Sequence, residues 1–282
     1  MKSHFYENTM MCHAWPQRQL GPPGIRHASE GITKEKLPLS SCILASGNRP
    51  LMKLMPMEHT MKSPSDTLDT MQIDIVSDVM CPWCVIGYKQ LEQALTATGL
   101  KVDLRWHPFE LNPGMPQDGQ NLAEHIAEKY GSTPAQSEET RARLQHLGAD
   151  LGLEFNFSDR SRIVNTFRAH QLLDWAETQS KQHALKLALF AAHFTDELDV
   201  SDDGVLVQVA RSVGLNASDA TDVLSSGAYA QSVRDKQQFW TSRGISGVPS
   251  VIFSGKYLLT GAQGAETYAD VLRKVQDETA AA

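Results

Sequence analysis

The segment that decides the fold is Met71-Gln-Ile-Asp-Ile-Val-Ser-Asp-Val-Met80, followed by Cys81-Pro-Trp-Cys84 and by Val85-Ile-Gly-Tyr-Lys-Gln-Leu-Glu-Gln-Ala-Leu95. The first part is an apolar run typical of a strand, and the last part has the three- and four-residue apolar spacing of a helix. Two thiols three positions apart can close into a disulfide within one helical turn, or reopen to a dithiol. A Cys-x-x-Cys pair between a strand and a helix therefore favours redox chemistry.

The sequence beyond this segment continues with further strands and helices. Val102-Asp-Leu-Arg-Trp-His107 alternates as a strand, and residues 120–243 have helical patterns almost throughout. Pro249–Phe253 and Lys256–Leu259 predict two strands joined by a turn, and a last helix begins near Ala265. The helices predicted in the long block are 121–130, 135–149, 164–178, 182–197, 203–213, 217–226 and 228–243. The order β-α-β, helical block, β-β-α predicts an α/β fold with a large α-helical insertion.

The N-terminal region differs from the rest of the chain. Residues 1–68 show no sustained helix or strand period and are rich in Pro, Ser, Gly and Met, so we predict a disordered N-terminal extension. Internal methionines at 52, 57, 61 and 71 offer alternative starts. A start assigned too far upstream is therefore a second hypothesis for this region, which N-terminal sequencing of the native protein would test.

Charge and cysteine content exclude several classes of function. The formal net charge is −7, which does not favour nucleic acid as a partner. No run of about 18 apolar residues predicts a membrane span, and the first 30 residues lack the apolar core of a secretory signal. Of the four cysteines, Cys12 and Cys42 lie in the unpatterned region, and no second Cys pair or neighbouring His pair completes a zinc site. We therefore expect a cytoplasmic protein with reduced thiols and no metal.

The two thiols are predicted to have different roles. If Cys81 caps the helix, its sulfur anion is stabilised by unpaired backbone N–H groups and the positive helix end, an effect of about 0.3–2 kcal/mol that would lower the pKa of Cys81. Pro82 suits the first helical position, Trp83 is predicted to shape substrate access, and both are expected to contact the substrate. Cys81 is then the attacking thiol, and Cys84, one turn further in, is the resolving thiol. Half of a metal site and two inert core thiols are the alternatives.

The segment Gly244-Ile-Ser-Gly-Val-Pro249 enters a predicted strand. Proline is tolerated as the first residue of a strand, which explains Pro249 without any function. A cis Val248–Pro249 bond is the functional alternative, because it would expose the Val248 backbone to an extended substrate strand beside Cys81. Since few X-Pro bonds in folded proteins are cis, the segment alone leaves both explanations open.

Four motifs in one order now carry a resemblance to a known family: Ser77-Asp-Val-Met-Cys-Pro-Trp-Cys-Val-Ile-Gly87, Trp106-His-Pro-Phe-Glu-Leu-Asn-Pro113, Asn165-Thr-Phe-Arg-Ala-His170 and Gly244-Ile-Ser-Gly-Val-Pro-Ser250. Together they resemble the DsbA-like thioredoxin superfamily, in particular its FrnE-like cytosolic branch. The resemblance covers about residues 71–278. It implies a thioredoxin-like fold interrupted by a helical insertion at 115–243, a redox pair at Cys81 and Cys84, and a cis-proline at Pro249.

The same resemblance includes a related branch with a different chemistry. The Asn165–His170 stretch also matches 2-hydroxychromene-2-carboxylate isomerases and kappa-class glutathione transferases, which implies that Asn165 lines the cleft. Those proteins typically carry serine where this chain has Cys81. Isomerase chemistry is therefore an alternative to redox chemistry. Phe239-Trp240 departs from the smaller residues expected in the family.

Two carboxylates are candidate proton acceptors. Asp78 and Glu110 are the acidic residues expected nearest to the thiols, and a partly buried carboxylate with a raised pKa could accept the Cys84 proton. Asp78 could instead cap the strand end, and Glu110 could bind loop amides. Asn165 also suits a helix N-cap, whereas His170 and His193 are expected to have core or surface roles.

The sequence thus predicts a cytoplasmic thiol–disulfide oxidoreductase without a bound cofactor. Its electrons would be exchanged with glutathione or a protein dithiol, and its substrates would be protein or small-molecule disulfides and thiols. Neither a nucleic acid nor a membrane is expected as a partner, and a homodimer is left open, as is the direction of electron flow. The alternatives are a glutathione-dependent isomerase or transferase acting on a small aromatic compound, and a non-enzymatic holdase or binding module.

Overall fold

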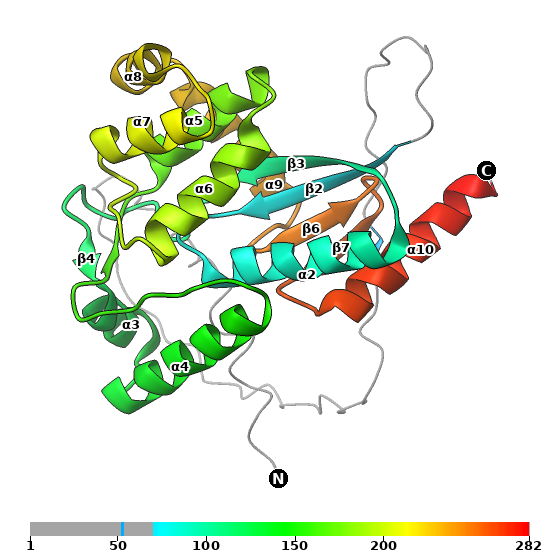
Figure 1. Ribbon diagram of the computed structural model, residues 1–282, viewed down its shortest axis with the longest axis horizontal. Helices are drawn as coiled ribbons and strands as arrows, with labels where there is room; N and C mark the ends of the chain where they lie inside the picture. The colour runs from blue at the N-terminus through cyan, green and yellow to red at the C-terminus, as the bar shows by residue number, and fades with distance from the viewer. Residues whose placement is uncertain (1–51, 54–69, 282) are drawn as a thin grey trace, which may run out of the picture.

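A five-stranded mixed sheet forms the centre of the molecule. The computed structural model describes residues 52–53 and 70–281. The sheet order is β1-β7-β6-β2-β3, in which β2 and β3 are parallel and the other pairs are antiparallel (Figure 1). The strands of this sheet are β1 (Met52–Lys53), β2 (Met71–Ser77), β3 (Val102–Pro108), β6 (Ser250–Phe253) and β7 (Tyr257–Thr260).

The helices cover both faces of this sheet. Helices α2 and α10 lie in front of the sheet in Figure 1, and α9 lies behind it. The helices are α2 (Pro82–Thr98), α3 (Leu122–Tyr130), α4 (Pro134–Asp150), α5 (Phe167–Thr178), α6 (Gln182–Phe194), α7 (Asp203–Ser212), α8 (Ala217–Ser226), α9 (Ala230–Ser242) and α10 (Ala265–Ala280). Among the described residues, no helix is long and apolar enough to cross a membrane. The predicted order β-α-β, helical block, β-β-α is confirmed.

The N-terminal region needs one correction. Met52 and Lys53 form the short edge strand β1, which pairs antiparallel with Leu258 and Tyr257 of β7. The prediction of disorder over 1–68 is therefore wrong at these two positions, because the open edge of β7 offers unpaired backbone groups to a neighbouring strand. The rest of that prediction falls outside the described residues.

The apolar run before Cys81 is explained by the position of β2 in the sheet. Neighbours β3 and β6 flank β2, and helices cover its two faces, so that residues 73–80 are all buried. Helix α2 then begins with Pro82 and ends at Gly99, whose φ of 67° is left-handed and therefore favours glycine. The strand thus delivers Cys81 to the N-terminus of α2, as the sequence predicted.

The predicted helix starting at residue 164 begins three residues later, at Phe167. Arg162 and Ile163 instead form the short strand β5 (Arg162–Ile163), which pairs with β4 (Gln120–Asn121). The predicted helix 182–197 ends at Phe194, and Glu197 has a left-handed φ of 52°. Both differences arise at ends of helices, where tertiary contacts outweigh apolar periodicity.

The helical insertion contains a second hydrophobic cluster. Helices α5 to α8 bury residues such as Leu172, Leu189 and Leu206 against each other, and Val79 and Met80 from the turn before Cys81 join this cluster. The first cluster contains the sheet together with α2 and α10. The turn that carries the thiols therefore lies where the two clusters meet.

Candidate functional site

Cys81 occupies the N-cap position of α2, with an extended backbone (φ −93°, ψ 109°) and Pro82 as the next residue. The Cys84 amide donates to the Cys81 carbonyl oxygen at 3.0 Å, which closes the first turn. Both cysteines are free and buried. The pair therefore lies at the start of a helix, as predicted, and the structure holds it as a dithiol.

The segment before β6 packs directly against this dithiol. The Val248–Pro249 bond is cis, which confirms the predicted bond geometry. The Cys81 thiol donates to the Val248 carbonyl oxygen over 3.8 Å between sulfur and oxygen. A Cβ atom at Gly87 in α2 would lie 3.2 Å from Pro249 Cγ, so the helix needs glycine there to approach the proline closely.

One expectation about this segment is wrong. Val248 was expected to present its backbone to a substrate strand, but the residue has 0% exposed surface and belongs to the hydrophobic cluster of the sheet. Its carbonyl group is occupied by Cys81. An extended substrate can reach Val248 only if neighbouring side chains move.

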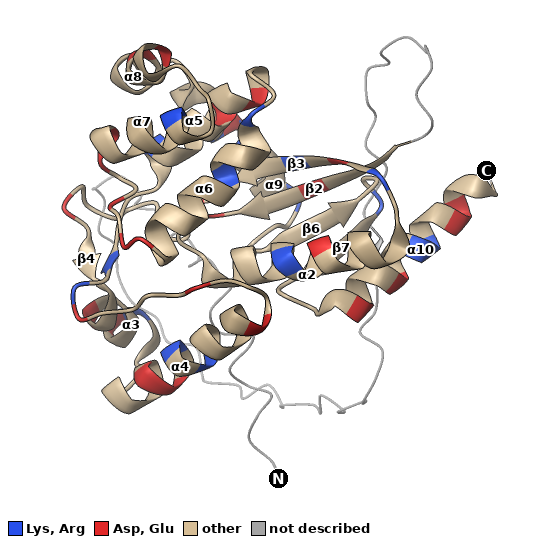
Figure 2. Ribbon diagram, in the orientation of Figure 1, with Lys and Arg blue, Asp and Glu red and all other residues tan. Residues whose placement is uncertain are grey.

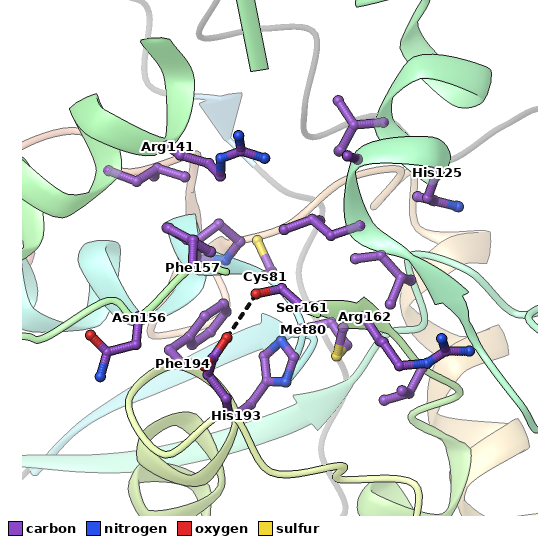
Figure 3. A pocket seen from close by; sticks show the side chains of 18 of the residues that line it. Met80, Cys81, His125, Arg141, Asn156, Phe157, Ser161, Arg162, His193 and Phe194 are labelled. Carbon is purple, nitrogen blue, oxygen red and sulfur yellow. Dashed lines mark hydrogen bonds between the residues drawn. The ribbon is translucent and has the colours of Figure 1, made fainter. Parts of the chain in front are cut away.

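A cavity of about 460 Å³ opens beside Cys81 (Figure 3). Met80, Cys81, Pro82 and Trp83 line one end of it, whereas Cys84 does not reach it. The other walls come from the helical insertion, in particular from α3, α4, residues 156–164 and the C-terminal end of α6. A cavity of this size fits a small molecule or a short peptide.

The walls of this cavity carry charges of both signs. Basic side chains come from α3, α4 and the segment around β5: His125, Arg141, Arg160 and Arg162. Figure 3 shows Arg141 on one side of Cys81, and His125 and Arg162 on another. The acidic residues lie after α6: Asp196, Glu197 and Asp199. Ser161, which lies between Arg160 and Arg162, donates to Glu197 Oε1 at 2.9 Å, so a hydrogen bond joins the basic segment to the acidic one.

The electrostatics of Cys81 differ from the prediction. Burial raises the pKa of Cys81 well above its usual value, and the neighbouring Cys84 and the negative charge of Asp78 raise it further. The position at the helix end and the hydrogen bond from the Cys84 backbone both favour the thiolate, but they are not enough to lower the pKa of Cys81 against these effects. The predicted lowered pKa is therefore wrong for this dithiol state, because the cost of burying the thiolate exceeds the stabilisation by the helix end.

Asp78 is buried in the turn between β2 and α2. Its Oδ2 accepts from the Leu111 amide at 2.7 Å, and its Oδ1 lies 3.5 Å from His170 Nε2. Burial alone would raise its pKa, but the interactions with His170 and Leu111 outweigh burial and lower it. The prediction that Asp78 has a raised pKa is wrong. A carboxylate that stays ionised is a poor acceptor for a thiol proton.

Comparisons with known proteins identify the family. Residues 72–273 match the family described as the DSBA-like thioredoxin domain. A Streptomyces coelicolor protein described as a probable DsbA oxidoreductase is 33% identical, with a TM-score of 0.70 over 74% of this chain and 91% of its own. The chain belongs to the DsbA-like thioredoxin family. The predicted thioredoxin-like fold with a helical insertion is confirmed.

Two more distant structures share the fold. The cytosolic disulfide reductase DsbM from Pseudomonas aeruginosa, solved with GSH, is 17% identical, with a TM-score of 0.53 over 73% of this chain and 98% of its own. A 2-hydroxychromene-2-carboxylate isomerase is 14% identical, with a TM-score of 0.54 over 74% of this chain and 98% of its own. At these identities the two structures show only that the fold is shared, so the chemistry of this domain has to be argued from its own residues.

The predicted substrate-binding residues divide into two groups. Pro82 and Trp83 line the cavity, but Asn165 does not. The Asn165 amide nitrogen donates to the Met115 carbonyl oxygen at 3.1 Å, and its Oδ1 accepts from the Phe167 amide at 2.9 Å. Thr166, not Asn165, is the N-cap residue of α5. Asn165 therefore fixes the entry of α5 and has no place in the cavity wall.

Glu110 is tied to α9. Its Oε1 accepts from Arg234 Nη1 at 2.7 Å and from Gln237 Nε2 at 2.8 Å. Its other oxygen is buried without a hydrogen-bond partner. These contacts give no support to the predicted role as a proton acceptor for Cys84. Among the described residues, no group of three or more His, Cys, Asp or Glu side chains could hold a metal ion.

The sequence analysis missed a buried lysine. Lys186 of α6 has 1% exposed surface, and burial lowers its pKa to about 8. The available signal was a charged residue inside Ala184–Phe194, the most apolar run of the helical block. The arginines of the cavity could not be found from sequence, because α4 and the β5 segment meet only in the tertiary structure.

Proposed function

We propose that this protein is a thiol–disulfide oxidoreductase in which Cys81 exchanges with substrate and Cys84 resolves the mixed disulfide. The observation that carries the proposal is the position of the two thiols: Cys81 lines the cavity, and Cys84 does not reach it. A substrate disulfide in the cavity can therefore meet Cys81 first. Resolution then leaves a Cys81–Cys84 disulfide and releases the reduced substrate.

The cavity favours small thiols and disulfides over protein chains as substrates. It is lined mostly by the insertion, and Val248, which would pair with an extended chain, is buried. Its basic and acidic walls suit a compound that carries both carboxylate and ammonium groups. Glutathione is one compound of this kind, and it or a protein dithiol is the proposed electron partner.

We propose the reducing direction for electron flow. The Cys81 hydrogen is held by the Val248 carbonyl group, and burial raises the pKa of Cys81. An oxidant of this fold requires a stabilised reduced thiolate, which these surroundings do not provide. A cytosolic location within the FrnE-like branch, as the sequence predicts, belongs to this proposal, and DsbM offers a cytosolic reductase of the same fold. A homodimer remains a prediction.

Trapping experiments test the assignment of the two thiols. After incubation with oxidised glutathione, Cys84→Ser should accumulate a mixed disulfide at residue 81, detected by mass spectrometry of tryptic peptides. Cys81→Ser should not accumulate one at residue 84. An adduct at residue 84 at comparable yield would contradict the proposed order of attack.

A redox titration against glutathione tests the direction. We expect a potential more negative than about −200 mV, on the reducing side of protein disulfide isomerase. A value near about −120 mV, as in strongly oxidising DsbA proteins, would reverse the direction. A pair that never titrates would remove the redox function altogether.

Isomerase or transferase activity on an aromatic compound is the second candidate. The observation in its favour is the aromatic side chains in the cavity wall, which include Trp83, Phe157 and Phe194. That activity should survive Cys84→Ser, since it requires no resolving thiol. Loss of turnover in Cys84→Ser would exclude it.

A further inference from the structure

Tyr268 of α10 is a fully buried tyrosine close to the helix that begins at the thiols. It has 0% exposed surface, and α10 lies beside α2 (Figure 1). A Cβ atom at Gly87 of α2, three residues after Cys84, would lie 3.4 Å from the Tyr268 hydroxyl oxygen and 3.2 Å from Pro249 Cγ. The hydroxyl group and the proline therefore meet α2 at the same glycine.

A chain of hydrogen bonds connects this hydroxyl group to Cys81. The Tyr268 hydroxyl donates to the Gly261 carbonyl oxygen at 3.2 Å. The Gly261 amide donates to the Pro249 carbonyl oxygen at 2.8 Å. The Val248 carbonyl oxygen, on the residue before this proline, accepts from the Cys81 thiol at 3.8 Å. The hydroxyl group is thus linked to the sulfur atom through the backbones of the two loops that flank β6 and β7.

Gly261 is the residue that makes this connection possible. It follows β7 directly, and its φ of 81° is left-handed and therefore favours glycine. In this turn the amide bonds to Pro249 while the carbonyl oxygen accepts from Tyr268. The position of Pro249 relative to α10 therefore depends on the Tyr268 hydroxyl.

This hydroxyl group acts as a hydrogen-bond donor and not as an acid or a base. Burial raises the pKa of Tyr268, and the nearby Cys84 raises it further. A tyrosine in water already titrates only near about pH 10, so Tyr268 keeps its proton at neutral pH. Its ring packs against Phe253, with 6.4 Å between the ring centroids. Phenylalanine would keep this packing and remove only the polar contact.

We propose that Tyr268 is a positioning residue for thiol exchange at Cys81. The inference rests on the proposed function. By holding Gly261, the hydroxyl group fixes Pro249 and so sets the Val248 carbonyl oxygen against the Cys81 sulfur. An oxygen that accepts from the thiol stabilises its protonated form and disfavours the thiolate. Since a disfavoured thiolate shifts the pair towards the disulfide, Tyr268 acts in the reducing direction proposed above.

Alkylation of Cys81 by iodoacetamide as a function of pH measures this effect. All proteins in the experiment carry Cys84→Ser, and the tryptic peptide that contains residue 81 is followed by mass spectrometry. We expect Tyr268→Phe to lower the pH midpoint of the alkylation rate by at least about 0.3 units, a gain of about twofold in rate below the midpoint. The reason is that the thiol loses a fixed acceptor for its proton.

Tyr257→Phe is the matched control. The Tyr257 hydroxyl donates to Glu278 and so also joins β7 to α10. Glu278 lies near the C-terminal end of α10, however, whereas Tyr268 lies in its first turn. The control removes the same atom from a bond between the same two elements, and it should leave the midpoint unchanged within about 0.1 units.

Gly87→Ala disturbs the same contact from the side of α2. Its methyl group would press on Pro249 and on the Tyr268 hydroxyl, so Pro249 must move away from the helix that Cys81 caps. The Val248 oxygen should then lie further from the sulfur atom, and the midpoint should again fall by at least about 0.3 units. This variant carries the test if Tyr268→Phe does not fold.

The charged groups around Cys81 are the same in all these proteins, since Asp78, Lys186, His193 and the charges of the cavity wall are unchanged. A midpoint for Tyr268→Phe equal to that of the Cys84→Ser protein, or an equal fall in Tyr257→Phe, would overturn the inference alone. A Cys84→Ser protein that forms no mixed disulfide with oxidised glutathione would overturn the proposed function, and with it the role of Tyr268 in exchange.

Discussion

The hydrophobic cluster of the sheet and the cluster of the helical insertion contribute different parts of the site. The sheet cluster contains Cys81, Cys84 and Val248, which are the groups that we propose to perform or orient thiol exchange. The insertion cluster contains neither thiol, but its helices and loops supply most of the cavity wall. The proposed chemistry therefore lies at the ends of strands, and the cavity proposed for the substrate is formed by an addition to the sheet.

Helix α6 connects these two regions. Leu185 and Leu189 pack into the insertion cluster, whereas Phe190 and Phe194 pack into the sheet cluster. Lys186 lies on the same helix, between Leu185 and Phe190 in sequence. A change in one region can thus be tested for its effect on the other.

The largest effect should come from the sheet region. Cys81→Ser should reduce turnover of hydroxyethyl disulfide by at least about 10³-fold, because a hydroxyl group cannot form the mixed disulfide. The variant should retain the wild-type circular dichroism spectrum, since the substitution changes one atom. Turnover above a tenth of the wild-type value would show that the chemistry is not located in the sheet region.

A core substitution in the insertion should affect stability and leave chemistry intact. Leu206 of α7 is fully buried, and Leu206→Ala should lower the free energy of unfolding in urea by about 2–5 kcal/mol. At 25 °C the folded variant should keep thiol turnover within twofold of the wild type.

The matched substitution in the sheet region is Leu272→Ala in α10, which is also fully buried. Because α6 belongs to both clusters, each variant should unfold in a single transition. Two separate transitions for Leu206→Ala would show that the insertion folds independently of the sheet.

Stability at alkaline pH should report the burial of Lys186 where the two regions meet. Its pKa falls from 10.5 to about 8 on folding, so between these values the unfolded chain binds more protons than the folded protein. The wild type should therefore gain stability relative to Lys186→Met as pH rises from 8 to 10.5, by at most about 3 kcal/mol. The difference between the urea midpoints of the two proteins over this range measures this gain. Taking the difference also cancels the opposite contribution of Cys81, which both proteins contain. A constant difference would contradict the burial of a titrating lysine.

The smallest effect should come from the cavity wall. Arg141→Gln should raise KM for an anionic disulfide such as oxidised glutathione about 3- to 10-fold and leave kcat unchanged, because the arginine lines the cavity as a cation and is not one of the exchanging thiols. Arg211→Gln in α7, outside the cavity, is the control and should leave both constants unchanged. A reduced kcat with constant KM would assign Arg141 to the chemistry instead of to binding.

Local patterns were sufficient for the order of elements and for the thiol pair. The apolar run of β2, the proline at the first position of α2 and the spacing of Cys81 and Cys84 depend on neighbours a few residues apart. Most helices of the insertion agree with the predicted ranges for the same reason. Errors of a few residues occurred where a tertiary contact ends an element, as at β5 and after Phe194.

The electrostatics of the site could not be derived in the same way. The position of Cys81 at a helix end is a local property and was predicted, but its pKa depends on burial between two clusters and on Asp78. Likewise, the contacts of Asp78 with His170 and of Glu110 with Arg234 join residues 92 and 124 positions apart. Desolvation and long-range pairing are properties of the packed protein. The direction of a pKa shift and the partner of a carboxylate therefore depend on residues outside the local motif.

The sequence by itself determined the strand–helix setting of the dithiol, because short-range stereochemistry dictates it, and the order of four separated motifs indicated the family and the proline beside the dithiol. Only the tertiary structure decided which thiol meets the cavity, that Val248 is covered, and that Lys186 of α6 is buried. Figure 2 shows basic and acidic residues interspersed over the helices of the described chain. Their net charge is readable from composition, but the grouping of opposite charges on two cavity walls arises only when α4, β5 and the end of α6 come together.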